Sequence, residues 1–270
     1  MDAPVTDSCI ARDFTVSPNH GERAAGSRID CILLHYTGLR TEALDDWTRD
    51  PGGEALRWLC EPQSQVSCHY IVDRDGHVTQ LVPEERRAWH AGRGAWKGCT
   101  DINSCSIGIE IVNAGHAGGL PPYPDMQIHA VIALCKDIIA RRGIPAERIL
   151  AHSDIAPDRK ADPGEHFPWD ALHRAGVGIW VDAVCDADGV DFREGDMGDD
   201  VLLLQQKLAR VGYDISATGL YDERTKFVVR AFQRRYRQAR VDDIADASTR
   251  ATLDALLAAL SATGDQVRSG

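Results

Sequence analysis

Two histidines occupy equivalent places in the sequence, each directly after a short apolar run. His35 follows Ile32-Leu33-Leu34, and His152 follows Ile149-Leu150-Ala151. Each run has the length of a buried strand, so each histidine is expected near the C-terminal end of a strand. That edge of an α/β sheet is where ligands usually bind, so the two imidazoles could face one another there.

A catalytic metal site needs a third protein ligand, and the loop PDRKADPGEHFPW offers Asp162. Two neutral imidazoles and one carboxylate, with a fourth position open, form the donor set of a catalytic zinc ion rather than of a closed structural one. A plainer interpretation stands beside this one. A histidine at a strand end is commonly a hydrogen-bonded structural residue, and an aspartate before proline commonly forms a turn.

A carboxylate also lies inside an apolar strand pattern. The segment SIGIEIVN alternates, which places Glu110 on the same side as Ser106 and Gly108. Burial raises the pKa of a glutamate toward neutrality, as a general base that takes a proton from water requires. The alternative is a glutamate on a solvated face of the sheet.

Lys160 precedes Asp162 by two residues. In an extended loop such residues project to the same side, so an ammonium group would lie beside the metal. It could stabilise an oxyanion that develops in the reaction. The alternative is a solvated surface charge, which is the usual role of a lysine in a loop.

The elements that must position these residues alternate between short strands and amphipathic segments. The predicted strands are residues 31–37, 69–73, 77–82, 106–112 and 148–154. Asp75-Gly76 predicts a tight hairpin between the second and the third, so part of the sheet is antiparallel. Residues 126–143 form the strongest predicted helix, which Gly143 ends. The pattern predicts an α/β fold with a mixed central β-sheet flanked by helices.

The composition changes after Trp180, where an acidic, glycine-containing stretch lacks apolar periodicity. We interpret residues 1–180 as a catalytic domain, 181–194 as an acidic linker, and 195–262 as a small C-terminal three-helix bundle. Exposed chain of the linker type is a preferred site of proteolysis. A fragment that ends near Asp188 is therefore expected to fold alone.

The overall composition excludes several classes of function. The net charge is −11, which disfavours binding to the phosphate backbone, so no nucleic-acid partner is expected. No stretch approaches the roughly 20 apolar residues of a membrane span. The first residues lack the basic and apolar regions of a secretory signal, and the eight cysteines include no CxxC pair. We therefore expect a cytoplasmic protein with reduced thiols, and a periplasmic or wall-associated protein is the alternative.

The motifs, in this order, resemble the zinc-dependent N-acetylmuramoyl-L-alanine amidases of the amidase-2 type, whose fold phage T7 lysozyme and peptidoglycan recognition proteins share. The matching stretches are SPNHGER, LLHYTG, HYIVDRDGHVTQLVPEERRAWHAG, SIGIEIVN and ILAHSDIAPDRKADPGEHFPW. Several independent stretches agree in order and spacing, which makes the resemblance specific.

Carried over by position, the resemblance assigns a role to each candidate residue. It implies the zinc ligands His35, His152 and Asp162. It implies Glu110 as the general base and Lys160 as the group that stabilises the transition state. His90, in the motif AWHAG, falls where the family lines its substrate cleft; the alternative is a structural histidine that caps a turn.

The C-terminal segment resembles a peptidoglycan-binding domain of the three-helix type. Its cue is the spacing LQ…L…GY…G.YD..T…FQ, although the segment VDDIAD lacks the usual glycine before the third helix. The alternative is a bundle that packs on the enzyme or dimerises it.

The resemblance implies hydrolysis of the amide between N-acetylmuramic acid, or its anhydro form, and L-alanine of the stem peptide. The partner would be peptidoglycan or a muropeptide, and the role cell-wall turnover or recycling. One alternative is a module that recognises muropeptides without cutting them, which the complete ligand set disfavours. Another is an unrelated zinc hydrolase, which the C-terminal segment disfavours.

Overall fold

The computed structural model describes residues 5–39, 49–185 and 187–268, which divide into two compact units. The first unit holds the chain up to Arg93, together with Asp101–His152 and Asp162–Gly178. The second holds everything from Ile179 onward. It also takes two segments that interrupt the first unit in the sequence, namely Gly94–Thr100 and Ser153–Ala161.

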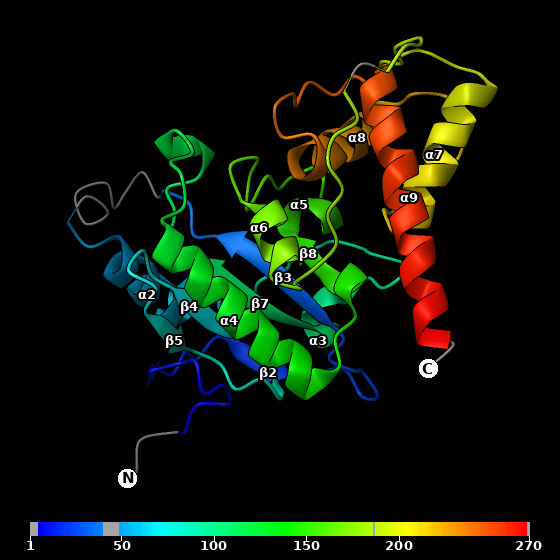
Figure 1. The fold of residues 1–270 in the computed structure, drawn as a ribbon. Helices are drawn as coiled ribbons and strands as arrows, with labels where there is room; N and C mark the ends of the chain where they lie inside the picture. Colours follow the sequence, from blue (N-terminus) through cyan, green and yellow to red (C-terminus); the bar gives the residue numbers. More distant parts are fainter. Residues whose placement is uncertain (1–4, 40–48, 186, 269–270) are drawn as a thin grey trace. The chain divides into compact units, whose positions relative to one another are not determined.

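The first unit is built on a six-stranded sheet in the order β1-β5-β4-β7-β3-β8 (Figure 1). Its strands are β1 Asp13–Phe14, β3 Cys31–Tyr36, β4 Tyr70–Val72, β5 Val78–Gln80, β7 Ser106–Ile111 and β8 Ile149–Ala151. All neighbouring pairs are parallel except β4 and β5, which the hairpin at Asp75-Gly76 joins. The prediction of a mixed central sheet is confirmed. A second sheet pairs β2, His20–Glu22, with β6, Arg86–Ala88.

The helices of the first unit differ greatly in length. They are α2 Pro51–Cys60, α3 Ile102–Cys105, α4 Asp125–Arg142 and α6 Trp169–Arg174, and α5 His152–Ile155 continues from this unit into the second. Gly143 ends α4 as predicted, because its φ of 67° suits glycine and its N–H bonds to the carbonyl of Ile139. Short 3-10 turns occupy Pro62–Ser64, His116–Gly118 and Ala146–Arg148.

Buried apolar side chains stabilise the sheet and pack α2 against it. Leu33, Leu34 and Ile109 on the central strands are fully buried, and each such side chain stabilises the fold by about 1.5–3 kcal/mol. Leu59 of α2 packs in one cluster with Ile71 of β4. Helix α2 therefore covers the sheet face to which Ile71 belongs.

All five predicted strands are shorter in the structure than in the sequence pattern, and the last of them differs most. The strand predicted over 148–154 ends at Ala151, and His152 begins the helix α5. The strand β8 lies at the edge of the sheet and pairs only with β3 among the described strands, through three residues. The chain can therefore leave the sheet after Ala151 without disrupting hydrogen bonds to a second neighbouring strand.

The second unit contains the three predicted helices, α7 Asp199–Val211, α8 Glu223–Tyr236 and α9 Ala247–Arg268. The prediction of a C-terminal three-helix region is confirmed, and α9 continues beyond the predicted boundary at residue 262. Asp222 caps α8, because its side chain accepts a hydrogen bond from the N–H of Thr225. The buried face of α8 includes Val228 and Phe232 at helical spacing.

The acidic stretch between the predicted domains is hydrogen-bonded to α9 and to the segment just before it. Phe192 and Ala245 exchange two backbone hydrogen bonds, and the N–H of Val184 donates to Thr252 Oγ1. The boundaries 1–180, 181–194 and 195–262 stay a prediction, because the compact units divide the chain differently.

Within the second unit, a buried carboxylate ties one of the interrupting segments to the C-terminal helices. Asp154 accepts a hydrogen bond from the hydroxyl of Tyr213 at 2.9 Å and an ion-paired bond from Arg235 Nη1 at 2.7 Å. Trp96, from the other interrupting segment, packs edge-to-face on Tyr213, with ring centroids 5.0 Å apart. Asp154 has no exposed side-chain surface, so this ion pair is shielded from water.

Two expectations about the chain as a whole can be compared with the described residues. None of the helices described is long and apolar enough to cross a membrane. All eight cysteines lie in the described ranges, and no disulfide joins any two of them there.

Candidate active site

The strands β3 and β8 bring two of the predicted ligands together. Leu34 and Ala151 are register partners, so the residues that follow them, His35 and His152, lie side by side. Their Nδ1 atoms are 2.9 Å apart, and Asp162 Oδ2 lies 3.0 Å from each. All three residues are buried, and together they form the cluster among the described residues that could hold a metal ion.

This cluster needs a positive charge at its centre. Burial alone would raise the pKa of Asp162, and positive charge and hydrogen bonds donated from His152 and His35 would hold it below its usual range, so an anionic carboxylate here needs a proton or a cation beside it. Three atoms that each carry a lone pair face one another within 3.0 Å. A proton or a metal cation between them relieves that repulsion, and two imidazoles with a carboxylate are a common donor set for zinc.

A chain of hydrogen bonds defines the tautomer of His35. The hydroxyl of Ser106 donates to the carbonyl of Ile102 at 2.6 Å, so its oxygen accepts the N–H from His90 Nε2 at 3.2 Å. His90 Nδ1 is then the acceptor for His35 Nε2, 3.0 Å away. The Nδ1 of His35 consequently carries a lone pair that faces His152 and Asp162.

His152 reaches the same state through a backbone group. Its Nε2 donates to the carbonyl oxygen of Ala91 at 2.9 Å, which leaves a lone pair on Nδ1. Burial, and next the neighbouring His35, lower the pKa of His90 well below its ordinary value, so His90 is neutral as the chain of bonds requires. Both predicted ligands therefore present an unprotonated Nδ1 to the centre of the cluster, which fits a metal ion.

The residues that share one side of β7 with Glu110 are small or polar because they surround the ring of His90. On the side shared with Glu110, Ser106 bonds His90, and Gly108 leaves room for the His90 ring. A Cβ at Gly108 would lie 2.4 Å from Cγ of His90, closer than any side chain can approach. The small residue at this position is therefore a requirement of the His90 site.

Glu110 lies beside His35 in the sheet. The two residues are register partners on β7 and β3, so their side chains leave the same face of neighbouring strands, whose spacing is about 4.8 Å. Glu110 is half-buried. The structure thus places the carboxylate predicted as general base next to a predicted ligand.

Lys160 belongs to the second unit, where it is half-buried and its backbone N–H donates to the carbonyl of Ala156 at 3.0 Å. Its contribution to the reaction stays a prediction. So does the contact of His90 with substrate, since the bonds of its ring run to His35 and Ser106.

Sequence reasoning missed several polar residues of this region. Tyr123 is buried and donates to the carbonyl of Pro163 at 2.8 Å; burial, and next the charge of Asp162, raise its pKa well above the ordinary value. Asn103 bonds the backbone beside His90. A single Tyr or Asn forms no motif or periodic pattern by which one sequence could identify it as part of a site.

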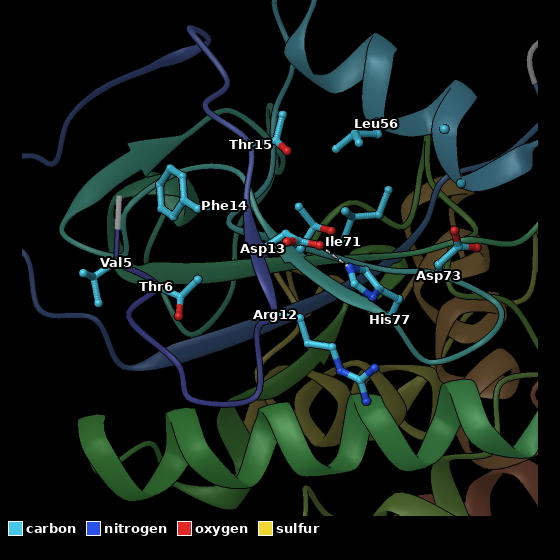
Figure 2. Close-up of a pocket in the computed structure, with 13 residues that line it drawn as sticks. Val5, Thr6, Arg12, Asp13, Phe14, Thr15, Leu56, Ile71, Asp73 and His77 are labelled. Carbon is cyan, nitrogen blue, oxygen red and sulfur yellow. Dashed lines mark hydrogen bonds and ion pairs between the residues drawn. The ribbon is translucent and has the colours of Figure 1, made fainter. Parts of the chain in front are cut away.

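A row of register partners continues across the sheet from the cluster. His35 neighbours Glu110, Glu110 neighbours Ile71, and the row continues through Thr79 to Asp13. A pocket of about 660 Å³ opens over the far part of this row (Figure 2). In Figure 2, Leu56 of α2 lies near Ile71, and a dashed line joins Asp13 to His77, whose ion pair measures 2.7 Å. The pocket begins one strand from Glu110, and none of the residues that line it belongs to the cluster.

Two imidazoles and a carboxylate at one edge of a mixed sheet, with a glutamate on the next strand, are the set of residues found in α/β hydrolases that use a single metal ion. Comparison with known families is more specific. The family described as N-acetylmuramoyl-L-alanine amidase matches residues 25–165, and the putative peptidoglycan binding domain matches residues 197–253.

Individual relatives agree with the family match. The N-acetylmuramoyl-L-alanine amidase AmiD of Escherichia coli is 39% identical over 251 residues, which cover 87% of this chain and 84% of the relative. The 1,6-anhydro-N-acetylmuramyl-L-alanine amidase AmpD of Enterobacter cloacae is 34% identical over 58% of this chain and 86% of its own length.

Solved structures show the same relationship. AmiD from E. coli, in complex with anhydro-N-acetylmuramic acid-L-Ala-D-gamma-Glu-L-Lys, aligns with a TM-score of 0.69 and 36% identity over 87% of this chain and 92% of that one. AmpDh3 from Pseudomonas aeruginosa aligns with a TM-score of 0.67 and 28% identity over 90% and 97%. The chain belongs to the N-acetylmuramoyl-L-alanine amidase family and is an enzyme of that class, a hydrolase with a peptidoglycan-binding domain.

Proposed function

We propose that the protein is a zinc-dependent amidase that cuts anhydro-muramyl peptides between the muramic acid and L-alanine. The observation that carries the proposal is the cluster of His35, His152 and Asp162, in which both imidazoles present an unprotonated Nδ1. These residues would hold the ion. When bound, zinc polarises a carbonyl oxygen and lowers the pKa of water to about 7.

The chain's own residues supply the proton transfers in this proposal. Glu110, one strand from His35, takes a proton from the attacking water as the water oxygen bonds to the scissile carbonyl carbon. It then returns that proton to the nitrogen of L-alanine as the C–N bond breaks. Lys160 donates hydrogen bonds to the oxyanion that develops on the carbonyl oxygen. The products are a muramic acid carboxylate and a free stem peptide.

The preference for an anhydro-muramyl substrate is supported by the relatives. AmpD is named as a 1,6-anhydro-N-acetylmuramyl-L-alanine amidase, and the AmiD complex contains an anhydro-N-acetylmuramic acid peptide. Such substrates place the enzyme in recycling of the cell wall. The match of residues 197–253 to a peptidoglycan-binding domain supports a second contact, with intact peptidoglycan.

Zinc stoichiometry combined with activity tests the proposal. The purified protein should contain about one zinc per chain, as a mononuclear site requires. His35→Ala and His152→Ala should lose both the zinc and the hydrolysis of an anhydro-muramyl tripeptide. His129→Ala is the matched control, because His129 lies exposed on α4 and should leave both unchanged. Full zinc occupancy in the His35→Ala, His152→Ala double variant would place the metal elsewhere.

We also propose that the protein works in the cytoplasm, because no disulfide joins any of its eight cysteines in the described residues, as a reducing compartment would favour. Fractionation of cells that produce the full chain tests this. Recovery of the activity with the envelope would contradict it and favour the periplasmic or wall-associated alternative.

A further inference from the structure

Two consecutive residues supply the partners for the outer nitrogens of both imidazoles. His90 Nδ1 accepts from His35 Nε2 at 3.0 Å, and the carbonyl of Ala91 accepts from His152 Nε2 at 2.9 Å. The position of the dipeptide His90–Ala91 therefore fixes the orientation of both rings at once. Any group that holds this dipeptide holds the two rings.

One side-chain oxygen binds both amides of the dipeptide. Asn103 Oδ1 accepts the N–H of His90 at 3.1 Å and the N–H of Ala91 at 2.8 Å. Asn103 is 5% exposed and lies in α3, immediately before the strand that carries Glu110. Its own backbone is fixed as well, because Arg23 Nη1 donates to its carbonyl oxygen at 3.0 Å.

We propose that Asn103 is a positioning residue for metal binding. By holding His90 and Ala91 through one oxygen, it keeps the Nδ1 atoms of His35 and His152 directed toward Asp162. The inference rests on the proposed function, namely metal binding by those three ligands. Hydrogen bonds to the second nitrogen of a metal-binding histidine fix its tautomer and ring orientation, and their removal weakens metal affinity by about 10–100-fold.

The same helix contains a matched control. Ser104 is also buried, and its Oγ donates to Asp101 Oδ2 at 2.7 Å and accepts from the N–H of Ala24 at 3.0 Å. Replacing Ser104 removes two partly buried hydrogen bonds from α3, and replacing Asn103 removes two buried ones. The partners of Ser104 are Asp101 and Ala24, neither of which belongs to the dipeptide His90–Ala91. A purely structural role of α3 would make the two positions equivalent.

The test compares metal binding in three variants of the full chain. The measurements are the Zn²⁺ dissociation constant, by competition with a chromophoric chelator, and the visible spectrum of the Co²⁺-loaded protein, which reports ligand geometry. Asn103→Leu should bind Zn²⁺ about 10–100-fold more weakly and alter the Co²⁺ spectrum. Asn103→Asp keeps an oxygen acceptor and should stay close to the natural protein. Ser104→Ala should also keep its affinity and spectrum, even where its unfolding temperature falls.

Unchanged Zn²⁺ affinity in Asn103→Leu, or an equal loss in Ser104→Ala, would overturn the proposal. Should Asn103→Leu fail to fold, Asn103→Ser takes its place, because a serine hydroxyl is too short to reach both amides. The same loss is expected there, and unchanged affinity overturns the proposal equally. If the natural protein itself binds no zinc, the proposed function fails, and this inference fails with it. If the natural protein binds zinc tightly and Asn103→Leu binds it equally well, only this inference fails, and the proposed function stands.

Discussion

The buried ion pair between Asp154 and Arg235 leads to a prediction about stability. In Arg235→Leu, the carboxylate of Asp154 stays buried without its cation. The Arg235 side chain is 4% exposed and that of Asp154 0%, so little water can replace the lost partner. Breaking a buried pair from one side costs about 3–5 kcal/mol. For a chain of this size, that corresponds to a fall in Tm of roughly 6–20 °C.

Thermal unfolding followed by circular dichroism measures this effect, with two companion variants. The pair Arg174 and Asp170 has a similar distance, 2.7 Å, but the arginine is 71% exposed, so Arg174→Leu should cost less than about 1 kcal/mol. Asp154→Leu combined with Arg235→Leu removes both charges and should regain much of the loss. A Tm for Arg235→Leu that matches that of Arg174→Leu would refute the reasoning.

Three further predictions follow from particular contacts. Glu110→Gln should retain zinc and lose about two to four orders of magnitude in turnover; turnover at the natural rate would remove Glu110 from the mechanism. Burial would raise the pKa of Glu84, but bonds from Arg141, Tyr70 and Arg142 lower it from 4.5 to about 2. The native state thus gains up to about 3 kcal/mol that is present above pH 4.5 and lost as the pH falls toward 2. Urea unfolding of Glu84→Gln should show a flatter dependence over this range, and an unchanged slope would contradict the assignment. Finally, a fragment ending near Asp188 lacks Tyr213 and Arg235, so we expect it to fold but to unfold at a lower temperature than the full chain; equal unfolding temperatures would contradict this.

The sequence predicts the parts of the site that depend on local pattern. The apolar runs before His35 and His152 define strands, and strand order in a parallel sheet brings their ends to one edge. Glu110 is recognisable because a carboxylate interrupts an apolar alternation. For these residues, secondary structure alone determines the approximate position.

Other parts of the site depend on contacts between segments distant in the sequence. The carbonyl of Ala91 has no sequence signature, since every residue carries one. The bonds of Asn103 to the backbone at His90 depend on how the helix α3 lies against the loop that carries His90. The pair of Asp154 and Arg235 spans 81 positions, and no local pattern indicates it. Such contacts follow from the packed fold and could not be predicted from periodicity or motif.

The most direct test of the account identifies the bond that is cut and its dependence on metal. The substrate is anhydro-N-acetylmuramic acid-L-Ala-D-gamma-Glu-L-Lys, the peptide bound in the related AmiD structure. Mass spectrometry of the products should show anhydro-N-acetylmuramic acid and the free tripeptide. The reaction should stop when a chelator removes the metal and resume when Zn²⁺ is added. An undiminished rate in metal-free protein, or cleavage at any other bond, would contradict the account.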